Sequence, residues 1–157
     1  MQSYHIGICI RSLGRIAACR TRLDGLELDA EIAAGLKANA RAKRLTRVPV
    51  IGPIGASAIA ALLPEPKVFR SGRDFAAWIG LTPREDSSGK TVRRGGITKK
   101  GDGYLRRLLV LGATAYLARI RRGQVKTASA WESRMAAHPK RKLAAVALAN
   151  KAARIAW

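Results

Sequence analysis

Residues 47–63 read RVPVIGPIGASAIAALL, and this stretch decides the fold. A short apolar segment leads into a turn that contains Gly52 and Pro53, and a run of small, helix-favouring residues follows the turn. Pro53 suits the first turn of that second helix, because the N–H group that proline lacks would have no partner inside the helix at this position. The pattern therefore predicts two helices joined by a tight corner.

The corner has two interpretations. The free backbone N–H groups at the start of a helix point outward and can hold a phosphate, so Gly52, Pro53 and Gly55 would form a helix-hairpin-helix-like grip on a nucleic-acid backbone. The alternative is an ordinary corner that buries Ile51 and Ile54. The sequence of the corner by itself leaves both interpretations open.

The composition extends the helical prediction to the whole chain of 157 residues. Hydrophobic residues make up 48% and aromatic residues 5%, with Ala and Leu the main apolar types. Packed helices use these residues, whereas sheets favour Val, Ile and aromatic side chains. We expect a mainly α protein with three parts. Residues 1–44 would form a remnant and a helical or coiled-coil arm, residues 45–122 the corner and a long basic loop, and residues 123–157 a small bundle with basic helices.

The charge balance points to a polyanionic partner. The chain has 30 Lys and Arg against 10 Asp and Glu, a formal net charge of +20. A membrane surface or a ribosomal-type RNA would satisfy the charge as well as DNA does.

Cys9, Cys19 and the two histidines form no metal-ligand cluster, so we expect no metal site in this chain. Since no apolar run comfortably spans a bilayer, we expect a soluble, cytoplasmic protein without a membrane partner.

Local signals mark the helix boundaries. Ser71 is a suitable N-cap for a short helix that would place Phe75 and Trp78 in the core. Asp102 is a suitable N-cap for the most regular helix of the sequence, and Gly123 would end that helix.

The two ends of the chain differ in charge. Four of the ten acidic residues lie at positions 24–31, beside Leu28, Ile32 and Leu36 at helical spacing, so this arm would pack or self-associate as a homo-oligomer rather than lie on DNA. In the last helix, residues 139–157, we expect Leu143, Val146 and Ala147 to face inward. Six cations and no acid follow Glu132, which suggests an external anion or a solvated basic tail.

Residues 80–102, GLTPREDSSGKTVRRGGITKKGD, form a long polar segment with at most a short hairpin around residues 91–97. Long irregular loops in compact domains are usually functional or disordered. Gly89-Lys90-Thr91 suggests a nucleotide phosphate loop, but that motif needs glycine where Arg84 stands, so nucleotide hydrolysis is rejected. The cations of this loop and the following helix are candidate DNA contacts: Lys90, Arg93, Arg94, Lys99, Lys100, Arg106 and Arg107.

The same loop contains two candidate nucleophiles, Ser87 and Ser88. A serine that attacks a phosphodiester needs deprotonation, in-line positioning and positive charge around the transition state. Gly89 permits a close backbone approach, and arginines can hold phosphate oxygens through paired hydrogen bonds. From the residues alone, a solvated turn rich in small residues is the favoured explanation of the Ser-Ser-Gly sequence.

The order of the motifs resembles the C-terminal serine domain of the insertion sequence 110 family of transposases, with its 116 and 902 relatives. The matching blocks are residues 48–53, 69–73, 75–83, 87–89, 96–102 and 105–109. The resemblance implies that Ser88, immediately before glycine, is the covalent nucleophile, with Ser87 as the second candidate. It also implies DNA as the substrate and a guide RNA as a further partner. Complete relatives would carry an acidic half that binds divalent metal.

Two departures from the family pattern stand out. The family has glycine where this chain has Val50, and valine is costly if that position requires a positive φ angle. We would then expect Val50→Gly to tighten DNA binding or leave it unchanged. Only some forty-five residues precede the corner, which predicts a member without the acidic half. Two function classes follow: a transposase domain with a serine nucleophile, or an inactive fragment that binds DNA or RNA without sequence preference.

Overall fold

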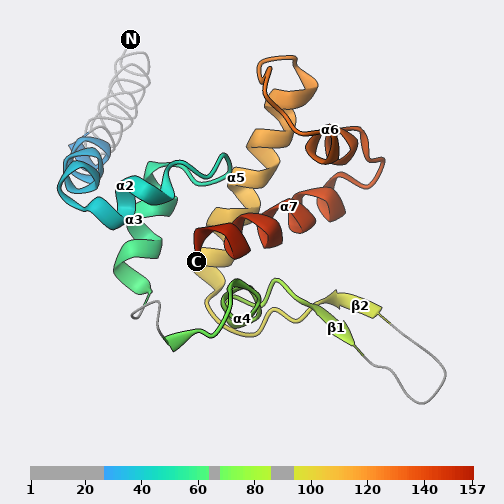
Figure 1. The fold of residues 1–157 in the computed structure, drawn as a ribbon, viewed down its shortest axis with the longest axis horizontal. Helices are drawn as coiled ribbons and strands as arrows, with labels where there is room; N and C mark the ends of the chain where they lie inside the picture. Colours follow the sequence, from blue (N-terminus) through green and yellow to red (C-terminus); the bar gives the residue numbers. More distant parts are fainter. Residues whose placement is uncertain (1–26, 64–67, 86–93) are drawn as a thin grey trace, which may run out of the picture.

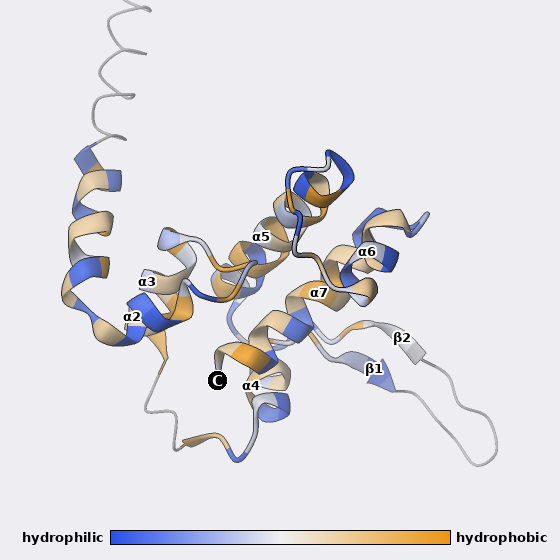
Figure 2. Cartoon of the chain, turned by 45° about the horizontal axis from the view of Figure 1, so that its top comes forward, coloured by the Kyte–Doolittle hydropathy of each residue, from blue (hydrophilic) through white to orange (hydrophobic). Residues whose placement is uncertain are grey.

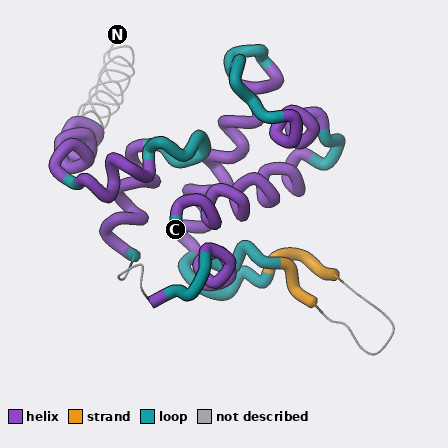
Figure 3. Tube along the Cα trace, in the orientation of Figure 1, coloured by secondary structure: helices purple, strands orange, loops and turns teal. Residues whose placement is uncertain are grey.

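The computed structural model describes residues 27–63, 68–85 and 94–157. The protein is mainly α, as predicted, with a single pair of strands in the described part (Figures 1 and 3). Residues 27–38 form a helix that extends away from the other elements. The elements that follow it are α2 (Ala40–Leu45), α3 (Pro53–Leu62), α4 (Gly72–Trp78), β1 (Pro83–Glu85), β2 (Arg94–Ile97), α5 (Gly103–Arg121), α6 (Ala130–Ala137) and α7 (Arg141–Ala156).

Helices α5 and α7 pack along each other at the centre of the protein, and α3, α4 and α6 pack around this pair. In Figure 2, hydrophobic colours run along α5 and α7, whereas β1 is coloured hydrophilic. Leu105, Leu109 and Leu117 of α5 are buried in this core. Their regular helical spacing explains why α5 could be predicted from the sequence.

The inward face predicted for α7 is wrong by about one position. Leu143 is 57% exposed, and Val146 and Ala147 are only half-buried. The buried stripe consists instead of Leu148 and five alanines, Ala144, Ala145, Ala149, Ala152 and Ala153. Small side chains let two helix backbones approach closely, and this stripe is buried where α7 packs against its neighbouring helices.

The predicted helix caps are confirmed. The Asp102 carboxylate accepts a hydrogen bond from the Leu105 N–H group at 2.8 Å, and the Ser71 hydroxyl accepts one from Asp74 at 3.3 Å. Gly123, with a φ of 70°, follows the end of α5 in the left-handed conformation that glycine favours. These local interactions fix where α4 and α5 begin, and therefore where the intervening loop is anchored.

A capping box begins α6, and it also links α6 to α5. The Glu132 carboxylate accepts a hydrogen bond from the Ser129 N–H group at 2.9 Å and one from the Tyr116 hydroxyl at 3.4 Å. Burial raises the pKa of Tyr116 above its usual value, and the nearby carboxylate of Glu132 raises it further. The Tyr116 hydroxyl therefore keeps its proton to a higher pH than a free tyrosine does, and it donates that proton to Glu132.

The aromatic residues of the α4 region form one cluster. Phe75 is fully buried, as predicted, and its ring lies 5.5 Å from that of Phe69 in an edge-to-face arrangement. Trp78 stacks on Phe75 at 6.1 Å but is 37% exposed, so its predicted place in the core is only partly correct.

Within the described ranges, every helix is too short or too polar to cross a membrane.

Candidate nucleic-acid interface

The corner between α2 and α3 is formed as the sequence predicts. Gly52 is the N-cap of α3, Pro53 occupies the first turn, and the Ala56 N–H group closes that turn by bonding to the Gly52 carbonyl at 2.9 Å. The N–H groups of Ile54 and Gly55 precede the first repeating helix bond, so they have no acceptor within α3. Gly52 has no side chain to accept them, and both Gly52 and Pro53 are exposed. The corner thus presents two backbone donors at an accessible helix start.

The residues that precede Gly52 anchor the corner in the hydrophobic core. Val48, Val50 and Ile51 are each less than 10% exposed, whereas Ile54 is 44% exposed. The corner therefore buries Ile51 but not Ile54. An apolar cavity of about 180 Å³ lies between the corner and α5. The turn is accordingly held by its apolar N-terminal half, which leaves its C-terminal half at the surface.

Val50 does not distort the corner, because it lacks the positive φ angle that would make valine costly at this position. Lys99 is the non-glycine residue with a positive φ angle in the described part of the chain, and Val50 has an ordinary backbone conformation. The Val50 side chain is buried, and its carbonyl lies where a Cβ on Gly112 of α5 would collide with it. Replacement of Val50 by glycine is therefore expected to remove buried apolar surface rather than to relieve strain.

The basic loop begins and ends in a short antiparallel hairpin. Pro83 of β1 pairs with Ile97 of β2, and Glu85 pairs with Arg94. The hairpin predicted around residues 91–97 is therefore correct for its second strand, β2. The strand that pairs with β2 is β1, which precedes the serines in the sequence. Ser87, Ser88, Lys90 and Arg93 lie outside the described residues, as does the side chain of Arg94.

The base of the hairpin is clamped against the end of α4. The Thr98 N–H group donates to the Thr82 carbonyl at 2.9 Å, and the Lys99 N–H group donates to the Gly80 carbonyl at 3.2 Å. Gly80 and Gly101 both have positive φ angles, at 79° and 95°. A Cβ on Gly80 would collide with the Lys100 backbone, and a Cβ on Gly101 would collide with the Trp78 carbonyl. Two backbone segments thus cross in direct contact, which only glycine permits.

Four of the predicted DNA-contacting cations surround this clamp. Lys99 and Lys100 are exposed within it, and Arg107 is exposed in the first turns of α5. Arg106 is half-buried, and its guanidinium donates a hydrogen bond to the Ile79 carbonyl at 2.8 Å. Arg106 therefore also holds the end of α4 against α5, with further donors left for other partners.

The sequence interpretation missed the residues that join these parts. No long-range contact was predicted for Gly112 or Asn150, yet the Val50 carbonyl of the corner packs directly on Gly112, and the Asn150 side-chain amide donates to the Leu81 carbonyl at 3.0 Å. Gly112 interrupts an otherwise strong helical pattern, and that interruption was the available signal. The contact of Asn150 spans 69 residues of sequence and has no local signature.

Helix α5 connects the two candidate contact regions. Gly112 supports the corner, and Arg106 holds the end of α4, against which the hairpin base is clamped. The two residues are six positions apart, which corresponds to about 9 Å along a helix axis. In the part of the chain that the structure describes, no three His, Cys, Asp or Glu side chains gather in a way that could hold a metal ion.

The chain is similar in sequence to known transposases. Residues 42–130 match the profile of the transposase IS116/IS110/IS902 family. The chain is 52% identical over 121 residues to the y4pF/y4sB transposase of Sinorhizobium fredii, covering 77% of this chain and 31% of that protein. It is 45% identical to a family 20 transposase of Pseudomonas aeruginosa, covering 83% and 38%. It is 40% identical to the transposase for insertion sequence element IS1328 of Yersinia enterocolitica, covering 83% and 39%.

These matches place the chain among the transposases. More narrowly, it belongs to the IS116/IS110/IS902 transposase family. The chain spans between 31% and 39% of the length of these three relatives. The family match begins at residue 42 and covers the corner, the hairpin and α5, which are the elements that form the candidate interface.

Proposed function

We propose that this chain is the DNA-binding and nucleophile-bearing part of a transposase, in which Ser88 attacks a DNA phosphodiester. The observation that carries the proposal is that one helix, α5, supports both the corner and the end of α4, against which the base of the hairpin is clamped; the strands of this hairpin flank the serines. A duplex phosphate held at the corner would place neighbouring phosphates of the same backbone within reach of the hairpin. Family membership supports the same function.

In the proposed reaction, a bond forms between the serine Oγ and the phosphorus atom while the bond from phosphorus to the leaving deoxyribose oxygen breaks. The serine gives up its proton, and the leaving strand end takes up a proton to become a hydroxyl group. Negative charge that develops on the phosphate oxygens would be stabilised by Lys90, Arg93, Arg94, Lys99 and Lys100. Arg106 and Arg107 extend this positive charge into α5. Transfer of the strand reverses the step with a new hydroxyl as the nucleophile. Ser87 is the second candidate for the nucleophile.

Two further partners belong to the proposal. The family resemblance supports a guide RNA, which would use the same excess of positive charge. The helix at residues 27–38 supports self-association, because it extends from the core and its Leu28 is 58% exposed. Divalent metal would be bound by the acidic half of a complete relative, and the residues of this chain would bind and position the DNA.

The DNA grip can be tested at Gly52. Space around this residue is open, and its φ of −81° suits any residue, so a side chain can be added without strain. An Asp at this N-cap would accept the Ile54 and Gly55 N–H groups and repel phosphate, whereas Asn would accept them without charge. We expect Gly52→Asp to lower duplex affinity several-fold more than Gly52→Asn, with both variants as stable as the parent or slightly more stable.

The measurement is fluorescence anisotropy with duplex DNA across a salt series. For the parent chain, the logarithm of the binding constant should fall linearly with the logarithm of the salt concentration, by about 0.9 for each phosphate neutralised. Equal affinities for Gly52→Asp and Gly52→Asn would remove the corner from the interface. Salt-independent binding would contradict the electrostatic account of the whole chain.

A further inference from the structure

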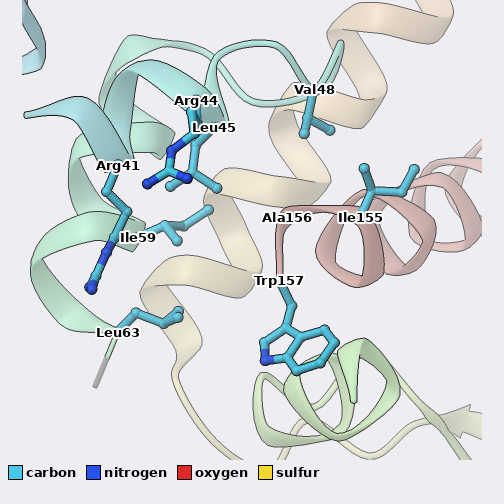
Figure 4. Close-up of a pocket in the computed structure, with 9 residues that line it drawn as sticks. All are labelled: Arg41, Arg44, Leu45, Val48, Ile59, Leu63, Ile155, Ala156 and Trp157. Carbon is cyan, nitrogen blue, oxygen red and sulfur yellow. The ribbon is translucent and has the colours of Figure 1, made fainter. Parts of the chain in front are cut away.

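Two hollows meet at the C-terminal end of α7, and their linings include neither Gly52, Pro53 and Gly55 nor the hairpin. The first, of about 330 Å³, lies between this end and the α2–α3 pair (Figure 4). The second, of about 920 Å³, follows one face of α7 and passes over the start of α4. Ile155 and Trp157 line both hollows. The two hollows therefore adjoin at these residues, and together they are called the α7 groove below.

The charged side chains that line the α7 groove, in the described part of the chain, are all cations. Arg41 and Arg44 lie on the α2 side, as Figure 4 shows. Arg73, Lys151 and Arg154 lie on the side of α4 and α7. A concave surface lined by one sign of charge focuses the field and concentrates ligands of opposite charge. The groove therefore suits a polyanion that is extended enough to contact both sides.

The groove also contains two tryptophans. Trp157 is 44% exposed and lies between the two hollows, with the start of α4 beside it. Trp131 of α6 is half-buried, and the Lys151 ammonium lies 4.3 Å from the centre of its ring. This cation–π contact orders the lysine beside the groove instead of leaving it free in solvent. The exposed part of the Trp157 indole offers a surface on which a planar ring can stack.

The combination of stacking surface and cations distinguishes between polyanions. Duplex DNA keeps its bases paired inside the helix and presents phosphates, for which an exposed indole has little use. Proteins that bind unpaired strands combine a positive groove with aromatic side chains on which bases stack. An acidic peptide would use the cations but would leave the indole without a matching partner.

We propose that the α7 groove binds a single-stranded nucleic-acid segment, with one base stacked on Trp157. Arg41 and Arg44 would contact phosphates on one side of that base, and Arg73 and Arg154 would contact phosphates on the other. The groove shares Val48 with the apolar half of the corner, but it includes neither the exposed helix start at Gly52 and Pro53 nor the hairpin, so it can exist whether or not Ser88 is a nucleophile.

The test uses the full chain and labelled oligothymidylate, oligouridylate and a DNA duplex, each of roughly 12 nucleotides or base pairs, a length comparable to single-strand footprints. Trp157→Ala should weaken binding of the single strands by roughly fivefold to a hundredfold, the loss expected for one stacked base. Duplex binding should change much less. Trp157→Phe should restore most of the single-strand affinity, whereas Trp157→Leu should not. Whichever single strand binds more tightly identifies the source of the segment.

Matched controls separate a site from general attraction. Arg73→Ala and Arg121→Ala remove the same charge, but Arg73 lines the groove whereas Arg121 is exposed in the last turn of α5. Arg73→Ala should weaken single-strand binding more than Arg121→Ala does. Equal losses for these two variants, together with no effect of Trp157→Ala, would overturn the proposal. Competition by polyglutamate as effective as competition by the oligonucleotide would also overturn it, because it would show binding by charge alone.

Discussion

The corner and the hairpin base solve the same packing problem in different ways. In both, one backbone segment rests directly on another. At the corner, the glycine is Gly112, in the middle of regular helix α5, and the turn itself has an ordinary backbone. At the hairpin base, Gly80 and Gly101 supply both the contact and a left-handed conformation. The corner therefore requires glycine for space only, whereas the hairpin base requires it for space and for backbone geometry.

Gly101→Ala should produce the largest effect. The new Cβ would meet the Trp78 carbonyl, and the residue would have to keep a φ of 95°. We expect a loss of about 3 kcal/mol or more in the free energy of unfolding, measured by urea denaturation. Gly123→Ala is the control, because its φ is 70° but nothing lies within 4 Å of the added Cβ. It should cost about 1 kcal/mol. Equal losses would mean that the collision contributes nothing.

Gly112→Ala should cost less, about 2 kcal/mol, because its backbone is helical and only the collision with Val50 operates. The matched control is Gly35→Ala, in the helix at residues 27–38 with open space around the added Cβ. That change should raise stability by up to about 1 kcal/mol through helix propensity. If alanine stabilised the protein at both positions, the close contact between α5 and the corner would be wrong.

Val50→Ala should have the smallest of these effects, about 1.5 kcal/mol, through the loss of two buried methyl-sized groups. The same thermal or urea unfolding series measures it. Because Val50 is not strained, DNA affinity per folded molecule should stay unchanged. In Val50→Gly, tighter DNA binding together with unchanged stability would instead support the idea that this position requires glycine.

The sequence predicted local structure well and long-range contacts poorly. The caps at Ser71 and Asp102, the end of α5 at Gly123 and the mainly α class all follow from interactions within a few residues. The inward face of α7 was missed because alanine carries little hydrophobic contrast, and its stripe depends on how closely α5 approaches. The positive φ angle suggested for residue 50 was placed at the wrong turn, and the left-handed residues are Gly80, Lys99, Gly101 and Gly123 in the described part.

The candidate site, too, was predicted where its signals are local and missed where its contacts are long-range. Gly52, Pro53 and Gly55 were identified from the pattern of a helix start, and the structure places Gly52 and Pro53 at that start. The shared support from α5 was not predictable, because it joins segments that are distant in the chain. The choice of Ser88 over Ser87 rests on family resemblance and stays a prediction.

The most direct test of the central claim is whether Ser88 becomes covalently attached to DNA. We would build a chimera of the Sinorhizobium fredii transposase in which this chain replaces the aligned segment of 121 residues, and incubate it with DNA of the element ends and divalent metal. A denaturant-resistant protein–DNA adduct should form with the chimera, persist with Ser87→Ala and disappear with Ser88→Ala, while salt-sensitive DNA binding persists in both variants. An adduct that survives Ser88→Ala but is lost with Ser87→Ala would show that the wrong serine was chosen, and an adduct that survives both substitutions would contradict the serine mechanism.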